Sequence, residues 1–255
     1  MAGKSSFINI DLDHLFSVSG GTSTSEIKNL NPYVLDVLRL VGLDLLAETK
    51  GENDAVERVR RTLILTSSFR DESNQVTQLK TKLDDAKKRM SDQEAIEAVA
   101  RLYSPEDGDP HMTQETHKTA LAALEMINVG DISGATSLVG SKPISMHQSY
   151  NSVDLRSTEG RKDKIMKSLD DLVRRGYLKD GAVFYNYESS SENPMHSGPE
   201  HVHLSVGEED PLTSAGRDYI ESAISTLNSF KGFGQPQSYS ISRDDVYDYY
   251  DGAYP

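Results

Sequence analysis

Three histidines stand close together in the sequence, at His196, His201 and His203. His201 and His203 alternate along a predicted strand, so their side chains point to the same face of that strand. With His196 they could supply three nitrogen ligands for zinc, but no acidic or thiolate partner stands at a recognisable spacing. We therefore predict a surface or structural role for these histidines, no metal site and no cofactor.

The sequence lacks the motifs that carry common catalytic chemistry. It has no phosphate-binding glycine loop and no serine in a G-x-S-x-G context. Gly20 and Gly21 lie in a linker without a following lysine, and paired acids such as Asp84 and Asp85 are typical of a solvated surface. We therefore predict no catalytic residues and a protein that is not an enzyme.

Basic side chains gather within residues 156–179, which contain more basic than acidic residues although the whole chain has a formal charge of −13. Basic residues on one helix surface can bind nucleic-acid phosphates. The alternative is that these charges only solvate an exposed helix face. The candidate nucleic-acid-binding residues are Arg161, Lys162, Lys164, Lys167, Arg174 and Arg175.

The elements that would position these residues follow one another within 156–224. Apolar spacing predicts a helix that ends at Gly176, as a C-terminal cap should. Alternating patterns predict strands over 182–187 and 201–206, and a further helix opens after Leu212. A helix, two paired strands and a helix form the order of a winged helix.

Three pieces of this segment resemble the winged helix-turn-helix regulators of the MarR and PadR type. Residues 169–178 (LDDLVRRGYL) look like the end of a recognition helix, the paired strands look like the wing, and 212–217 (LTSAGR) look like the phrase that follows the wing. The resemblance covers about a quarter of the chain and implies DNA binding. The sequence departs from the family in the long gap before this helix. It also departs in the wing loop, which carries Glu188, Glu192 and Glu200 and no lysine or arginine.

Helical patterns also fill the N-terminal part of the chain. Helices are predicted over 32–47, 54–66 and 71–90, followed by a capping box at Ser91 and Glu94. The third helix carries apolar residues with heptad spacing. This seam predicts either packing within the domain or an oligomer contact, and its residues are Val76, Leu79, Leu83, Ala86 and Met90.

Residues 104–110 combine two prolines, a glycine and acids, which predicts a break between domains. A helix is expected from Thr113 to Gly130 and a short one near 135–139. We expect a fold that is mainly α with a small β-hairpin, in which a helical N-terminal region precedes a winged-helix-like α+β domain. The predicted parts are an N-terminal arm and linker (1–25), a helical domain (26–104), the winged-helix-like domain (111–230) and a tail (231–255).

The tail has few aliphatic residues and many acids, so it is predicted to be disordered alone. Aromatic groups among acids suit docking on a partner or a neighbouring subunit. The alternative is a tail that only aids solubility. The candidate docking residues are Tyr247, Tyr249, Tyr250 and Tyr254.

The absence of cysteine and of a long apolar run narrows the cellular setting. We expect no disulfide, no membrane insertion, and an intracellular location in the cytoplasm, the nucleus or nucleoid, or a virion. Two functions stay open. The first is a winged-helix protein that binds double-stranded DNA or RNA as a homo-oligomer. The second is a structural or scaffold subunit whose winged helix and tail bind proteins.

Overall fold

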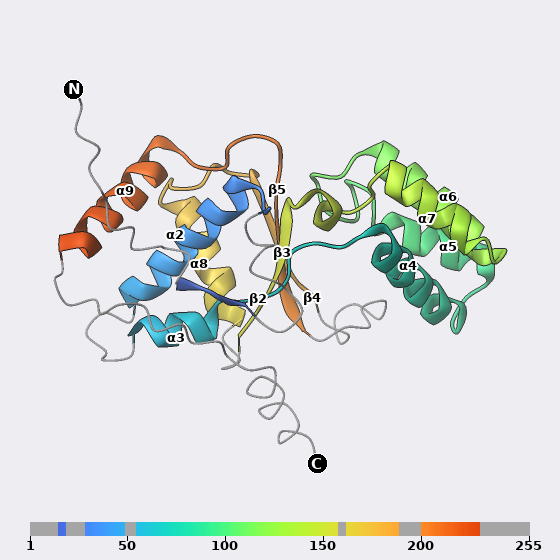
Figure 1. Ribbon diagram of the computed structural model, residues 1–255, viewed down its shortest axis with the longest axis horizontal. Helices are drawn as coiled ribbons and strands as arrows, with labels where there is room; N and C mark the ends of the chain where they lie inside the picture. Colours follow the sequence, from blue (N-terminus) through green and yellow to red (C-terminus); the bar gives the residue numbers. More distant parts are fainter. Residues whose placement is uncertain (1–14, 19–28, 49–54, 158–161, 189–199, 230–255) are drawn as a thin grey trace, which may run out of the picture.

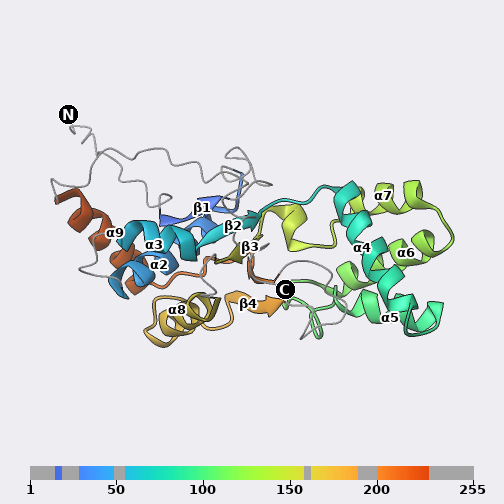
Figure 2. The same cartoon turned by 90° about the horizontal axis from the view of Figure 1, so that it is seen from below.

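The computed structural model divides the protein into two lobes that stand side by side (Figure 1). It describes residues 15–18, 29–48, 55–157, 162–188 and 200–229. One lobe contains a sheet covered by helices, and the other contains helices alone (Figures 1 and 2). Within these residues the fold is mainly helical with a small five-stranded sheet, so the predicted class, mainly α with some β, is confirmed.

The sheet has the strand order β1-β2-β3-β5-β4. β1 pairs parallel with β2, and the other neighbours pair antiparallel. The two strands predicted near 182–187 and 201–206 are present as an antiparallel pair, but β5 also pairs with β3, so the expected hairpin is part of a larger sheet. The strands are β1 (Ser17–Val18), β2 (Ile64–Ser67), β3 (Ser152–Arg156), β4 (Val183–Glu188) and β5 (His201–Val206).

Helices cover one face of this sheet and bury its apolar side chains. Val202, Leu204 and Val206 alternate along β5 and share one core with the apolar stripes of α2 and α8. This separates an apolar face, which packs on helices, from an opposite face that carries the polar residues of each strand. The helices of this lobe are α2 (Pro32–Glu48), α3 (Ala55–Thr62), α8 (Lys162–Arg174) and α9 (Ser214–Ser229).

The second lobe is a bundle with its own hydrophobic core. Ser91 accepts a hydrogen bond from the amide of Glu94 and the Glu94 carboxylate accepts one from the amide of Ser91, so the predicted capping box is confirmed. Gly130 follows the helix α6 (Gln114–Asn128) and has a φ of 85°, a backbone conformation that favours glycine. The helices of this lobe are α4 (Glu72–Lys87), α5 (Asp92–Arg101), α6 (Gln114–Asn128) and α7 (Ile132–Ser141).

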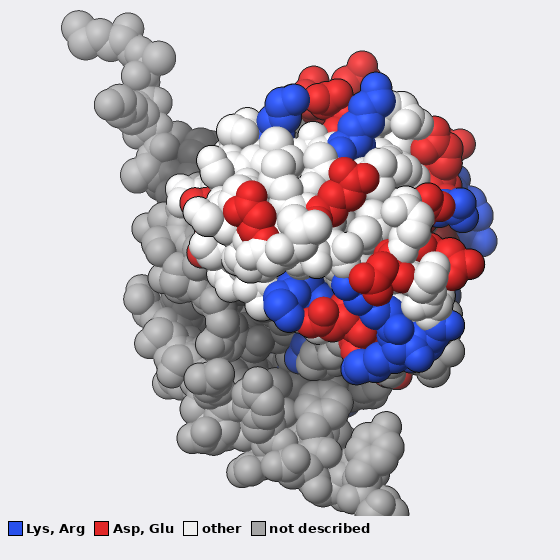
Figure 3. Space-filling model, turned by 90° about the vertical axis from the view of Figure 1, so that its right-hand side faces the viewer, with Lys and Arg blue, Asp and Glu red and all other residues white. Residues whose placement is uncertain are grey.

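The heptad seam of α4 lies inside this second core. Val76, Leu79, Leu83 and Ala86 are at most 3% exposed, and Met90 packs against the same cluster. The interpretation of the seam as a contact between chains is therefore corrected, because α5, α6 and α7 of the same chain already cover it. On the end face of this lobe, basic and acidic side chains lie next to one another (Figure 3).

The division between the lobes also differs from the predicted domain boundary at 104–110. Tyr103 and Ser104 are buried, and the amide of Gly108 donates to the carbonyl of Ser104 at 2.9 Å. This segment is a turn between α5 and α6 within one core. Proline and glycine end a helix there but do not end the lobe, which is inserted between β2 and β3.

The predicted helix over 54–66 ends at Thr62, because Ile64 and Leu65 are buried in β2 and pair with β1 and β3. Most of the N-terminal arm and the whole tyrosine-rich tail, with Tyr247, Tyr249, Tyr250 and Tyr254, lie outside the described residues. Among the helices that are described, none has the length and apolar character needed to cross a bilayer.

Candidate functional site

The polar face of the sheet forms the wall of a cleft between the two lobes. Asp154, His203 and Asn186 form one row across β3, β5 and β4, because Asp154 is paired with His203 and His203 with Asn186. The next position along the pair β4–β5 places Glu188 opposite His201. Strand alternation therefore brings five polar side chains to one face while their neighbours build the core.

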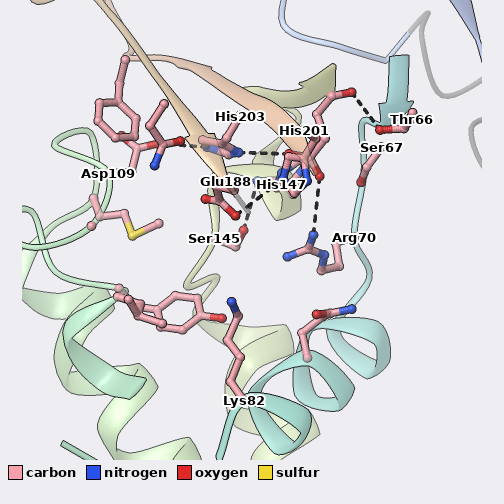
Figure 4. Close-up of a pocket in the computed structure, with 18 of the residues that line it drawn as sticks. Thr66, Ser67, Arg70, Lys82, Asp109, Ser145, His147, Glu188, His201 and His203 are labelled. Atoms are coloured by element: carbon pink, nitrogen blue, oxygen red, sulfur yellow. Dashed lines mark hydrogen bonds and ion pairs between the residues drawn. The ribbon is translucent and has the colours of Figure 1, made fainter. Parts of the chain in front are cut away.

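Three imidazole rings converge on one carboxylate oxygen in this row (Figure 4). Asp154 Oδ1 lies 3.2 Å from His147 Nε2, 3.1 Å from His203 Nδ1 and 3.3 Å from His201 Nε2. These side chains are mostly buried, with His201 and His203 still reaching solvent through the cleft. The cluster combines nitrogen and oxygen donors that could hold a metal ion.

His147 reaches the cluster from the segment that enters β3. It belongs to the short 3-10 helix η2 (Met146–Ser149), whose first turn is capped by Ser145. The Ser145 hydroxyl accepts a hydrogen bond from the amide of His147 at 3.3 Å. Tyr150 ends η2 in a left-handed conformation with a φ of 60°. This tight turn leads the chain directly into β3, so His147 and Asp154 lie close although they are seven residues apart.

Two further carboxylates surround the cluster. Asp109, from the turn between α5 and α6, lies with Oδ2 3.6 Å from His203 Nε2, and Glu188 Oε2 lies 3.5 Å from His201 Nε2. Asp109 is 3% exposed and accepts a hydrogen bond from the amide of His111. The ion pair between Asp109 and His203 therefore links the helical lobe to the sheet.

The electrostatics of the cluster follow from burial and from these pairs. Burial opposes the ionisation of Asp154, but His147 and His201 outweigh it and lower the pKa of this carboxyl well below its usual range. Burial also opposes charge on His203, yet hydrogen bonding to Asp109 and Asp154 raises its pKa to about 10. For His147, burial dominates and lowers the pKa. The carboxylates of Asp109 and Asp154 therefore favour positive charge at His203, and the neighbouring histidines favour negative charge at Asp154.

The distances within the cluster match the ligand set of a transition-metal ion. Ligand atoms of His147, Asp154 and His203 all lie within 4.8 Å of one another. Zinc binds nitrogen and carboxylate oxygen at about 2.0–2.2 Å. Two tetrahedral ligands of one ion therefore lie roughly 3.3 to 3.6 Å apart. The contacts of 3.1 to 3.3 Å around Asp154 Oδ1 are close to this spacing.

The cleft in front of the cluster has a volume of about 650 Å³. The sheet and η2 form one wall, and α4, the loop before it and the α5–α6 turn form the other (Figure 4). This second wall carries the cations Arg70 and Lys82 and the hydroxyl of Tyr103, which accepts a hydrogen bond from Gln75 Nε2 at 3.1 Å. The site thus faces a set of cations across an open space.

The candidate nucleic-acid-binding residues lie elsewhere, on and beside α8. Lys167 pairs with Glu48 at 3.1 Å and with Asp171 at 2.8 Å, and Arg174 also pairs with Asp171. Lys162 lies 3.4 Å above the ring of Tyr187 and 3.9 Å from Glu200. Lys164 is partly buried on the same helix, and Arg161 lies outside the described residues. Much of the basic charge of this helix is therefore met by acids of the same chain.

Arg175 has a structural partner, since it forms an ion pair with the buried Asp44 of α2. Ser168 donates a second hydrogen bond to Asp44, at 2.7 Å. Ile165, Leu169 and Leu172 bury the other face of α8 in the core. The helix that resembles a recognition helix is thus held against α2 by both apolar packing and a buried carboxylate.

Residues 212–217, the segment that resembles the one after the wing, connect α8 to α9 by local contacts. Thr213 donates its hydroxyl to the carbonyl of Gly176 and accepts a hydrogen bond from the amide of Gly216. A Cβ at Gly216 would stand only 2.2 Å from the Tyr177 carbonyl oxygen, so glycine permits this close approach. Arg217 pairs with Asp210. These residues fasten the start of α9 to the end of α8.

Sequence reasoning did not find the histidine–aspartate cluster. It recognised that His201 and His203 share a face, but His196 lies outside the described residues and the missing acidic partner is Asp154, which precedes His201 by 47 positions. The five-residue strand around Asp154 (SVDLR) alternates too briefly to be recognised. No acidic partner stood at a recognisable spacing in the sequence, and the structure supplies one from a distant strand.

Comparison of the chain with protein-family models, curated proteins and solved structures finds no match.

Proposed function

We propose that the protein is a metal-dependent hydrolase whose metal ion is bound by His147, Asp154 and His203, with His201 beside them. One observation carries the proposal. Three imidazole nitrogens lie within 3.3 Å of a single carboxylate oxygen at the wall of an open cleft. Clusters of histidine and aspartate with this spacing suit zinc and related ions. The proposal replaces our expectation of a protein without metal or catalysis.

The position of the cluster favours a catalytic site over a structural one. Structural zinc sites are closed by four protein ligands, whereas catalytic sites keep a position open to water or substrate. This cluster borders a cleft of about 650 Å³, which is within the usual range for small-molecule sites. An ion held there would be reached by a ligand from the cleft.

Hydrolysis is the reaction that these groups support best. A bound metal ion lowers the pKa of its water to about 7 and polarises the bond to be cleaved. Glu188 lies beside His201 at the cleft and is placed to accept a proton from that water. With the ion held by His147, Asp154 and His203, Glu188 would take the proton of the attacking water as its oxygen bonds to the electrophilic atom, and would return that proton to the leaving oxygen as the bond to it breaks.

Binding of nucleic acid through α8 and assembly through the tail stay predictions. Most of the described basic residues on α8 contact acids of the same chain, and the docking tyrosines lie outside the described residues. The cleft brings together more chemically distinctive groups than either of those surfaces, so it supports the stronger proposal.

Metal binding tests the proposal directly. The full chain, freed of metal by chelation, is titrated with Zn²⁺ in a calorimeter, and its metal content is then measured. We expect one ion per chain. Asp154→Asn or His147→Ala should weaken binding by at least about 100-fold, since even outer-shell partners contribute about 10–100-fold. His117→Ala, on α6 and away from the cleft, is the matched control and should bind as the wild type does.

Catalysis is tested on the metal-loaded protein with a panel of chromogenic carboxylic and phosphate esters. Glu188→Gln should keep the metal and lose about 10²–10⁴-fold in turnover, which is the usual contribution of a general base. A wild type that binds no metal ion, or ligand variants that bind as well as the wild type, would contradict the metal site. The cluster would then be a buried ion-pair network.

A further inference from the structure

We infer that the cleft binds a phosphorylated small molecule, with its phosphate between the metal site on the sheet and the cations Lys82 and Arg70 on the opposite wall. The inference rests on the proposed function, because it assigns a substrate class to the same site. Its evidence is separate from the metal cluster and comes from the helical lobe.

Lys82 differs from the other lysines of α4. Lys80 pairs with Asp84 at 2.5 Å, and Lys87 pairs with Asp92 at 3.2 Å. Lys82 is partly buried in the wall of the cleft and directs its ammonium group into it (Figure 4). Within the described residues no acceptor lies within hydrogen-bonding or ion-pairing distance of this ammonium.

A partly buried ammonium that no described residue pairs with is unfavourable in the absence of a ligand. Burial lowers the pKa of Lys82, while the more distant carboxylates of Glu188 and Asp154 favour its charged form. An anionic ligand in the cleft would supply the missing acceptor. Lys82 is therefore better explained as a group that contacts a ligand than as a group that stabilises the fold.

Arg70 offers a second set of donors at the same side of the cleft. Its Nη2 lies 4.0 Å from Asp154 Oδ2, and its Nη1 lies 3.4 Å from Gln75 Oε1, so both contacts are long (Figure 4). A guanidinium group has five N–H donors in a fork that matches phosphate oxygens. Arg70 lies between the metal cluster and the helical wall, and could bind one oxygen while Lys82 binds another.

A phosphate fits this arrangement better than a carboxylate does. Its several oxygens can contact a metal ion, a guanidinium and an ammonium at the same time, and its two negative charges balance the charges of both cations. Hydrolysis of a phosphate monoester would join the water oxygen to phosphorus and break the P–O ester bond, giving inorganic phosphate and an alcohol. The cations would contact the phosphate oxygens as negative charge builds up on them.

The remainder of the cleft suits the organic part of such a molecule. Phe184 lines the sheet side, and Leu102 and Met112 line the helical side. Phe69 lines the cleft near Arg70 and stacks on Tyr150 with ring centroids 4.4 Å apart. Small-molecule sites usually combine such apolar walls with a few convergent polar groups. We therefore expect an aromatic or apolar group attached to the phosphate.

The test uses the full chain, both metal-free and zinc-loaded, with inorganic phosphate and phenyl phosphate as probes and calorimetry as the measurement. Lys82→Met should weaken binding of both probes at least tenfold and leave Zn²⁺ binding unchanged. Lys80→Met, on the exposed face of the same helix, should bind both probes as the wild type does. Arg70→Gln is a second variant with the same expected loss, in case one substitution disturbs the fold.

The outcomes separate this inference from the proposed function. If Zn²⁺ binds but Lys82→Met and Arg70→Gln bind phenyl phosphate like the wild type, the inference is overturned and the metal site stands. Equally tight binding of benzoate would also overturn it, in favour of a carboxylate ligand. If Zn²⁺ does not bind, the proposed function fails. Phosphate binding to the metal-free protein that depends on Lys82 would still support the inference, and its absence would overturn both.

Discussion

At the scale of single residues, two buried carboxylates, Asp154 and Asp44, are each surrounded by hydrogen-bond and ion-pair partners. Asp154 is 6% exposed and is contacted by three imidazole rings, and the equally buried Asp44 is contacted by Arg175 and Ser168. An ionised carboxylate in the interior is costly unless it is paired and hydrogen-bonded. The two acids differ in surroundings, because Asp154 faces an open cleft while Asp44 lies between α2 and α8 and has a structural role.

Arg175→Met should therefore destabilise the fold by leaving Asp44 without its cation. Removing one partner of a fully buried pair costs about 3–5 kcal/mol. Since the Arg175 side chain is 39% exposed, we expect a smaller loss, about 2 kcal/mol, in the free energy of unfolding measured with urea. Arg174→Met is the control and should change stability little, because Arg174 is 77% exposed. Equal effects of the two substitutions would show that Arg175 is only a surface charge.

At the scale of elements, each strand of the sheet serves two purposes through its alternation. In β5, Val202, Leu204 and Val206 build the core, while His201 and His203 line the cleft. In the helical lobe, α4 likewise buries its seam and presents Lys82 at the cleft. His201, His203, Asp154 and Lys82 therefore lie on regular elements, which hold side chains more rigidly than loops do, whereas Arg70 and Asp109 come from the connections between elements.

A substitution in the seam of α4 tests whether the seam packs within its own chain or between chains. Leu83→Ala should lower the free energy of unfolding by about 2–5 kcal/mol, because Leu83 is 1% exposed within the core of its own chain. The particle size measured by size-exclusion chromatography should not change. Lys80→Ala, on the exposed side of the same helix, is the control for helix content. A folded Leu83→Ala variant with normal stability but a smaller particle would instead place the seam between chains.

At the scale of the whole molecule, the described residues form two separate cores, and residues of both lobes line the cleft. Asp109 of the helical lobe pairs with His203 of the sheet, and Arg70 lies near Asp154 at the point where the chain passes from β2 to α4. Opposite walls carry complementary groups, with the histidine–aspartate cluster on one and Lys82 on the other. Ligands that bridge two lobes commonly draw them together.

We expect zinc and phenyl phosphate together to reduce the radius of gyration measured by small-angle X-ray scattering. Zinc alone should change it less, because its ligands are concentrated on the sheet and η2. Lys82→Met should bind zinc without the further decrease on addition of phenyl phosphate. An unchanged radius in the wild type with both ligands bound would mean that the cleft is already in its ligand-binding form.

The sequence by itself determined most of the helices and two of the strands. The apolar stripe of α2, the capping box before α5, the glycine after α6 and the alternation of β5 are local patterns, and the structure has each of them. Local patterns are reliable because periodicity and capping depend on residues within a few positions of one another.

Only the tertiary structure decided which of these elements share a core and which residues share a site. β2 and β3 are too short for their patterns to be recognised. The helical lobe is inserted between them, so these two paired strands are far apart in the sequence. The histidine–aspartate cluster needs Asp154 to lie opposite His203, a pairing set by strand register across 49 positions. Register and lobe packing depend on long-range burial of apolar surface, which spacing along the chain does not record.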